Sequence, residues 1–184
     1  MGRPIFLDRD GVINVEPSKF GRDYVTSPQE FQFISDAING LKMLVENNYD
    51  VYIISNQAGV AKGIFTVQQL QDVTDYMLEI LNQKGIKIKG VFYCIHRSED
   101  NCNCRKPKTG NLEIVWQKYS GLKKDKIFFV GDQERDIHTA RNFSILSILV
   151  LSGKTSVSEL GRFSIIPEYV AYNLYDAVKN IILK

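Results

Sequence analysis

The chain has 184 residues, of which 44% are hydrophobic and 24% are charged, and this balance excludes a disordered chain and suits one domain over residues 1–184. The 23 basic and 21 acidic side chains give a net charge of +2, which is too small to indicate a nucleic-acid or membrane surface. Because no apolar run reaches the roughly 20 residues of a membrane span and the first residues lack an apolar signal segment, we expect a cytoplasmic protein with no membrane partner. The small net charge predicts no nucleic-acid partner, and we expect a monomer.

Short apolar runs alternate with amphipathic stretches along the chain. In chain order, the pattern predicts strand 4–7, helix 36–48, strand 50–55, helix 66–85, strand 90–95, helix 111–121, strand 126–132, helix 134–143, strand 145–153, strand 168–172 and helix 174–184. Alternating strands and helices, with nearly continuous apolar strands, predict a doubly wound α/β fold whose parallel sheet is covered on both faces. Ligands in such folds lie beyond the carboxyl ends of the strands, so we expect the functional residues there.

Acidic side chains follow two of these predicted strands. Asp8 and Asp10 come directly after the first strand, and because side chains alternate they can face the same way. Two close carboxylates repel unless a cation lies between them or one of them is protonated, and Mg²⁺ prefers such hard oxygen ligands. Asp132 supplies a third acid, and Asp136 lies one helical turn further on. Each acid alone is typical of a turn or a helix cap, but the group together favours a magnesium site.

All three cysteines and one of the two histidines lie in the loop 94–104. The spacing is Cys-x-His, five residues, then Cys-x-Cys, with Cys94, His96, Cys102 and Cys104 as candidate ligands. Three thiolates and one imidazole match a tetrahedral zinc site, and four protein ligands leave no place for water. The spacing therefore predicts a structural Zn²⁺ that holds the loop, rather than unliganded surface thiols or a redox pair.

Four segments, each at a predicted strand end or in a loop, resemble the motifs of the haloacid-dehalogenase-like (HAD) phosphatases. They are DRDG at 8–11, ISNQ at 54–57, Lys106 in CRKP, and GDQERD at 131–136. The longer segments FLDRDGVIN and SNQAGVAKG, together with the Cys-His loop, more narrowly resemble the heptose bisphosphate phosphatases and the related histidinol phosphatases. The resemblance covers residues 4 to about 150.

The resemblance implies a role for each residue of these motifs. Asp8 would be the nucleophile that forms an aspartyl-phosphate, and Asp10 the general acid and base, with its backbone carbonyl on the metal. Asp132 would complete the Mg²⁺ site formed with Asp8 and Asp10. Ser55 and Lys106 would hold the phosphate oxygens on which the transition-state charge develops.

The substrate would be held by further polar residues. The expected set is Glu16, Ser18, Lys19, Asn56, Gln57, Arg105 and Gln133. Asn56 and Arg105 would contact the sugar or its second phosphate. Gln133 stands where many relatives have lysine, which removes a positive charge near the phosphate. The loop 15–25 is either a plain surface loop or a substrate-gripping loop, and the chain has no room for the inserted cap domain of larger relatives.

The function implied by the resemblance is a Mg²⁺-dependent phosphatase for a small phosphorylated sugar. It would remove the phosphate at carbon 7 of D-glycero-D-manno-heptose 1,7-bisphosphate to give heptose 1-phosphate, in the biosynthesis of nucleotide-activated heptose. One alternative is a histidinol-phosphate phosphatase. Another is a phosphoacceptor signalling domain, which also uses clustered acids and a lysine but needs no zinc loop. A zinc-bearing nucleic-acid binder is disfavoured by the near-neutral charge.

Overall fold

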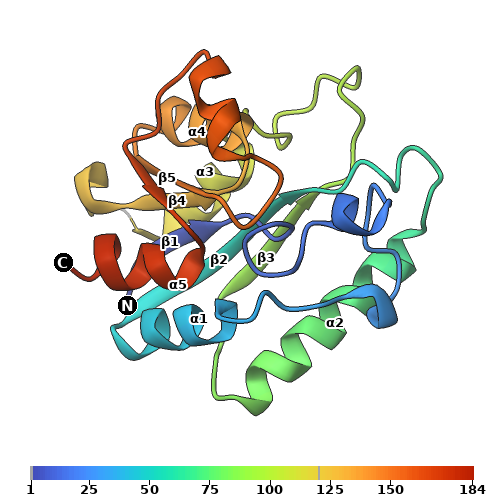
Figure 1. Ribbon diagram of the computed structural model, residues 1–184, viewed down its shortest axis with the longest axis horizontal. Coiled ribbons are helices and arrows are strands. Elements are labelled where there is room, and N and C mark those ends of the chain that lie inside the picture. Colours follow the sequence, from blue (N-terminus) through green and yellow to red (C-terminus); the bar gives the residue numbers. More distant parts are fainter. Residues whose placement is uncertain (1, 120) are drawn as a thin grey trace.

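Six parallel strands form one sheet in the centre of the computed structural model, which describes residues 2–119 and 121–184 (Figure 1). They are β1 (Arg3–Leu7), β2 (Tyr49–Asn56), β3 (Gly90–Cys94), β4 (Phe128–Gly131), β5 (Leu146–Val150) and β6 (Tyr169–Ala171). Their order is β3-β2-β1-β4-β5-β6. The predicted doubly wound α/β fold is confirmed, and the order reverses direction between β1 and β4, where such folds bind their ligands.

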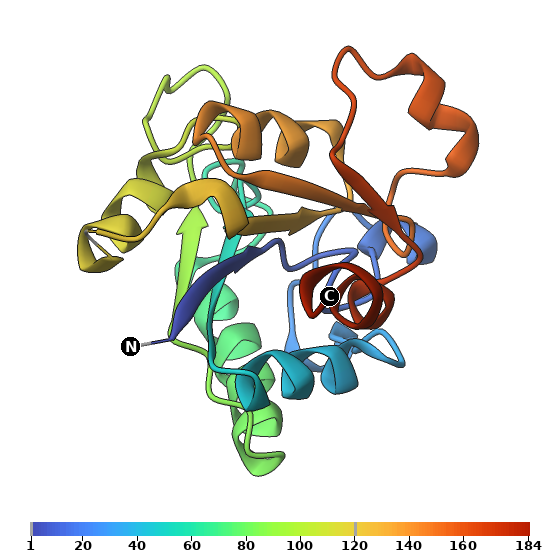
Figure 2. The same cartoon turned by 90° about the vertical axis from the view of Figure 1, so that its left-hand side faces the viewer.

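Helices cover both faces of the sheet (Figure 2). One face carries α1 (Ala37–Glu46), α2 (Val67–Gln83) and α5 (Leu174–Ala177), the last continued by a π-helical turn, Val178–Ile182. The other face carries α3 (Gly110–Trp116) and α4 (Glu134–Asn142). Side chains alternate along a strand, so Ile5 and Leu7 of β1 pack in the core under α1, α2 and α5, whereas Phe6 packs in the core under α3 and α4. The central strand β1 is thereby fixed from both sides.

The predicted elements match those observed, with differences at their ends. Thr66 begins α2 with a capping box, and Gly85 follows the helix in a left-handed conformation at φ 74°. The predicted helix 111–121 is shorter, because α3 gives way to a 3₁₀ turn at Gln117–Tyr119; position 120 lies outside the described residues. The predicted strand 145–153 stops at Val150, since the chain then turns over the carboxyl edge of the sheet. No helix in the described part of the chain is long and apolar enough to cross a membrane.

A long loop connects β1 to α1 without an inserted domain. Its regular structure consists of two short 3₁₀ helices, Pro17–Phe20 and Pro28–Glu30, and isolated bridges. The fold thus lacks a cap, as predicted. The first part of this loop forms a wall of the cavity described next.

Candidate functional site

A cavity of about 260 Å³ lies at the carboxyl ends of β1, β2 and β4. Seven of the residues expected from the sequence line it: Asp8, Asp10, Glu16, Ser55, Asn56, Arg105 and Gln133. Parallel strands end at one edge of the sheet, and this brings together residues that are far apart in the sequence.

Asp8 and Lys106 form a buried ion pair at this site. Lys106 Nζ lies 2.7 Å from Asp8 Oδ2 and also 2.7 Å from Asp136 Oδ1. Burial would raise the pKa of Asp8, but the adjacent ammonium outweighs it and holds this pKa below its usual value. Burial would likewise lower the pKa of Lys106, but Asp136 and Asp8 raise it above its usual value. Asp8 is therefore a carboxylate and Lys106 an ammonium at neutral pH.

Three buried carboxylates, those of Asp8, Asp132 and Asp136, meet at one point, with one oxygen of each within 4.8 Å of the others. Burial, followed by the charges of Asp136 and Asp8, raises the pKa of Asp132 well above its usual value. Hard oxygen ligands gathered this closely fit a divalent cation such as Mg²⁺. Asp136, which lies one helical turn after Asp132, belongs to the cluster itself.

Two glycines allow the backbone to approach Asp132 closely. A Cβ atom on Gly153 would lie 2.1 Å from Asp132 Oδ2, and one on Gly11 would lie 2.4 Å from it. The backbone N–H of Lys154 donates to the same oxygen at 2.7 Å. The turn after β5 therefore fixes the orientation of this carboxylate.

Asp10 is held by donors on both of its oxygens. Arg9 and Asn14 donate to Oδ1 at 3.0 and 2.9 Å, and Gln57 Nε2 donates to Oδ2 at 2.8 Å. Gln57 also donates to Ser55 Oγ at 3.3 Å and is itself fully buried. In this structure Gln57 thus lies behind Asp10 and Ser55, next to the cavity wall.

Asn56 pairs with the backbone of Lys106 in both directions. Its Oδ1 accepts from the Lys106 N–H at 3.0 Å, and its Nδ2 donates to the Lys106 carbonyl at 3.1 Å. The last residue of β2 therefore holds the segment that delivers the buried ammonium.

The polar residues of the loop after β1 lie in two different environments. Glu16 is buried and lines the cavity, whereas Ser18 and Lys19 are exposed on the 3₁₀ helix Pro17–Phe20. Lys19 Nζ donates to the Ser152 carbonyl at 2.7 Å, which links this loop to the turn over Asp132.

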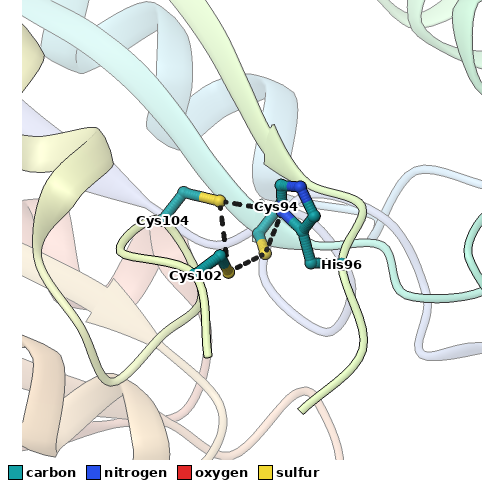
Figure 3. A group of neighbouring side chains, drawn as sticks. All are labelled: Cys94, His96, Cys102 and Cys104. Atoms are coloured by element: carbon teal, nitrogen blue, oxygen red, sulfur yellow. Dashed lines mark hydrogen bonds between the residues drawn. The ribbon is translucent and has the colours of Figure 1, made fainter. Parts of the chain in front are cut away.

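The three cysteines and His96 converge from the end of β3 and the loop that follows (Figure 3). Cys94 and Cys104 each lie 3.5 Å from Cys102 Sγ, and His96 Nδ1 lies 3.7 Å from Cys94 Sγ and 3.3 Å from Cys104 Sγ. Tetrahedral zinc with Zn–S near 2.3 Å and Zn–N near 2.0 Å separates its ligands by about 3.8 Å (S to S) and about 3.5 Å (S to N). The four ligand atoms fit such a site.

Arg105 connects this cluster to the cavity. It follows Cys104 directly, lines the cavity, and donates from Nη1 to the His96 carbonyl at 3.3 Å. The orientation of its guanidinium, and of Lys106 beside it, thus depends on the shape of the Cys-His loop.

Several residues of the site were not predicted from the sequence. Arg9 is fully buried, pairs with Asp10, and lies over the Tyr93 ring at 5.6 Å. Arg135, Lys154, Tyr24 and Lys62 also line the cavity. Arg135 lies within the acidic segment GDQERD at a strand end, and that position was a usable signal for it. Tyr24 and Lys154 lie in loops whose path follows no periodicity.

Comparisons with known proteins give a consistent set of relatives. A family model described as HAD-hydrolase-like matches residues 103–177. The D-glycero-alpha-D-manno-heptose-1,7-bisphosphate 7-phosphatase of Photorhabdus laumondii is 38% identical over 147 residues, which cover 76% of this chain and 77% of the relative. The D-glycero-beta-D-manno-heptose-1,7-bisphosphate 7-phosphatase of Pasteurella multocida is 32% identical and covers 98% of this chain and 97% of its own.

A solved structure with a similar fold is the D,D-heptose 1,7-bisphosphate phosphatase from B. bronchiseptica, complexed with magnesium and phosphate. Its TM-score is 0.88 at 28% identity, and the match covers 98% of each chain.

Proposed function

The chain belongs to the D,D-heptose 1,7-bisphosphate phosphatase family of HAD-like phosphatases, and we propose that it removes the phosphate at carbon 7 of D-glycero-D-manno-heptose 1,7-bisphosphate. The products are heptose 1-phosphate and inorganic phosphate. The proposed reaction is a step in the biosynthesis of nucleotide-activated heptose. The observation that carries this proposal is the buried Asp8–Lys106 pair, whose Asp8 lines a cavity together with Asp10 at the carboxyl edge of the sheet.

Asp8 is the proposed nucleophile. One carboxylate oxygen attacks phosphorus, and the bond between phosphorus and the C7 oxygen breaks. Asp10 gives a proton to the departing oxygen and then takes one from the water that attacks the aspartyl-phosphate. The second step releases phosphate and restores the Asp8 carboxylate. The proximity of Lys106 favours this role because it keeps Asp8 ionised.

The transferring phosphate is held by charge and by hydrogen-bond donors. Lys106 and the Ser55 hydroxyl are the proposed donors to its oxygens. Mg²⁺ would be held by Asp8, Asp132 and the Asp10 carbonyl, and Asp136 is close enough to act as a ligand or to orient one. When bound, Mg²⁺ neutralises charge on the phosphate oxygens.

The remainder of the cavity would bind the sugar and the second phosphate. We propose Arg105, Asn56, Gln133 and Glu16 as contacts, because all four line the cavity. Ser18, Lys19 and Gln57 lie just outside its lining and would reach substrate only if the loop after β1 or the Asp10 network shifts.

A structural Zn²⁺ in the Cys94, His96, Cys102 and Cys104 cluster would fix the loop that carries Arg105 and Lys106. We also propose that the protein acts as a cytoplasmic monomer and that residues 1–184 form one domain.

Phosphate release from a substrate panel tests the proposed activity. The panel contains the α and β anomers of heptose 1,7-bisphosphate, histidinol phosphate and fructose 1,6-bisphosphate, each with Mg²⁺ and with the Asp8→Asn variant as the blank. We expect the highest kcat/KM for a heptose bisphosphate and no turnover by the variant. Faster release from histidinol phosphate would contradict the proposed substrate, and unchanged turnover by Asp8→Asn would contradict the mechanism.

A further inference from the structure

Arg135 lies in the first turn of α4. In the sequence it stands between Asp132 and Asp136, which both belong to the cluster of three buried carboxylates. Its side chain lines the same cavity as Asp8 and Ser55. The mechanism described above gives it no role.

The guanidinium is held in place but is not neutralised. Its Nη2 donates to Gln133 Oε1 at 2.6 Å, and Gln133 Nε2 in turn donates to Asp132 Oδ1 at 3.4 Å. Gln133 is uncharged, so this contact orients the guanidinium and leaves its charge unpaired.

The carboxylates around Arg135 are engaged by other cations. Lys106 forms the ion pairs with Asp8 and Asp136, and Arg9 forms the one with Asp10. Among the described residues, no carboxylate forms an ion pair with Arg135, and its buried Nε has no hydrogen-bond partner. Leaving a buried charged donor without a partner is unfavourable, so the arrangement suits an anion that enters the cavity.

We infer that Arg135 is a phosphate-binding residue that donates to an oxygen of the phosphate being transferred from the substrate. The inference rests on the proposed phosphatase activity and adds a specific ligand to it. A guanidinium presents a planar fork that matches two phosphate oxygens, which a single ammonium such as Lys106 cannot do. The charge of Arg135 also acts on Asp8. Burial raises the pKa of Asp8 and Lys106 lowers this pKa, and Arg135 is a further cation that lowers it. This proximity to the nucleophile favours the transferring phosphate over the remote one.

The test compares Arg135→Gln and Arg135→Lys with the wild-type enzyme on heptose 1,7-bisphosphate and on p-nitrophenyl phosphate, which has a single phosphate. We expect Arg135→Gln to lower kcat/KM by about tenfold to hundredfold on both substrates, as for loss of a charge-assisted hydrogen bond. The inhibition constant of inorganic phosphate should rise by a similar factor. Arg135→Lys should recover part of both losses, because it keeps the charge without the fork. Arg141→Gln removes a positive charge from an exposed position on the same helix and should change neither quantity.

Three outcomes would overturn the inference. An unchanged phosphate inhibition constant in Arg135→Gln would make the residue structural. A loss confined to the bisphosphate would assign Arg135 to the remote phosphate. A higher Mg²⁺ requirement with unchanged phosphate inhibition would mean that the residue acts through Gln133 and Asp132.

If the wild-type enzyme cleaves p-nitrophenyl phosphate but no heptose bisphosphate, the proposed substrate is wrong, while the role of Arg135 is still measured. Circular dichroism and Tm identify a folding defect in Arg135→Gln, and Arg135→Lys then decides through the phosphate inhibition constant.

Discussion

Lys106 Nζ lies 2.7 Å from Asp8 Oδ2, and both side chains are almost fully buried. Asp8 follows β1 and Lys106 follows the Cys-His loop, so the pair joins two segments about a hundred residues apart in the sequence. A buried charge pair of this kind contributes little net stability, because desolvating two ions offsets their attraction. Its contribution, in the proposed mechanism, is to function: it would keep the proposed nucleophile ionised and place a positive charge next to the phosphorus that is attacked.

Replacing Lys106 with methionine should abolish most of the activity. The variant loses the donor to the transferring phosphate, and Asp8 loses the neighbour that lowers its pKa. We expect kcat to fall by about 10²- to 10³-fold, the usual effect of removing one preorganised donor to a developing charge. Phosphate release at saturating substrate measures this. Lys118→Met removes an exposed lysine from the 3₁₀ turn after α3 and should leave kcat unchanged. A Lys106→Met enzyme with wild-type kcat would exclude this residue from the chemistry.

Asn56→Ala should lower activity through the position of Lys106. The amide holds the Lys106 backbone by two hydrogen bonds, and their loss lets the segment shift. Because small displacements of catalytic groups are expensive, we expect kcat/KM to fall about tenfold to hundredfold. The Mg²⁺ concentration for half-maximal activity should not change, since Asn56 is not one of the clustered acids. Asn82→Ala, at an exposed position of α2, is the control. If Asn56→Ala mainly raises KM while kcat stays constant, Asn56 acts only through its proposed contact with the substrate and not through the position of Lys106.

The sequence predicted the sheet and most of the site because both depend on local patterns. Apolar runs identify the strands, and the parallel topology places Asp8, Ser55 and Asp132 at one edge. The Cys-His spacing likewise identified its cluster directly. The neighbours of Asp10 and the turn over Asp132 were not predictable in this way. They depend on side-chain hydrogen bonds such as that of Gln57, and on the path of the chain after Val150, which no periodic pattern encodes.

Removing one of the proposed zinc ligands should lower metal content and activity together. In Cys102→Ala the cluster keeps three ligands, and we expect the zinc content to fall from about one to near zero per chain. Without the metal the loop should loosen, which would move Arg105 and Lys106 and reduce turnover. Elemental analysis and phosphate release measure the two effects. Ser98→Ala changes the same loop without touching a ligand and should preserve both. Full turnover by a zinc-free Cys102→Ala protein would separate the metal from catalysis.

Glu168 should contribute to stability only above acidic pH. Its carboxylate accepts a hydrogen bond from the Ser147 N–H at 2.7 Å and so fastens the edge strand β6 to β5. Burial would raise its pKa, but the Ser147 hydrogen bonds outweigh this and lower it from the usual 4.5. A carboxyl with a lowered folded-state pKa stabilises the fold above 4.5, and this contribution is lost as the pH falls through the folded-state value. Because Glu168 is exposed, we expect Glu168→Gln to cost less than about 1 kcal/mol at pH 7.

Urea unfolding at several pH values measures this difference in unfolding free energy. The gap between wild type and Glu168→Gln should be present at pH 7 and should shrink below pH 4.5. A gap that stays constant down to pH 3 would show that packing, and not the charge, is responsible.

Gly153→Ala should weaken Mg²⁺ binding without a general loss of stability. A methyl group at this position would lie 2.1 Å from Asp132 Oδ2, so either the carboxylate or the turn must move. Asp132 is buried with little room to adjust, and its Oδ2 also accepts the Lys154 N–H. We expect the Mg²⁺ concentration for half-maximal activity to rise about tenfold, because Mg²⁺ demands near-ideal ligand geometry.

Gly161→Ala, on the same segment of chain, is the matched control. A Cβ atom at this position would have no neighbouring atom within 4 Å. Mg²⁺ titrations of phosphate release, run beside thermal unfolding, separate the two effects. An unchanged Mg²⁺ requirement in Gly153→Ala, with intact folding, would mean that Asp132 does not bind the ion; Asp8 and Asp136 would then have to hold it without the third acid.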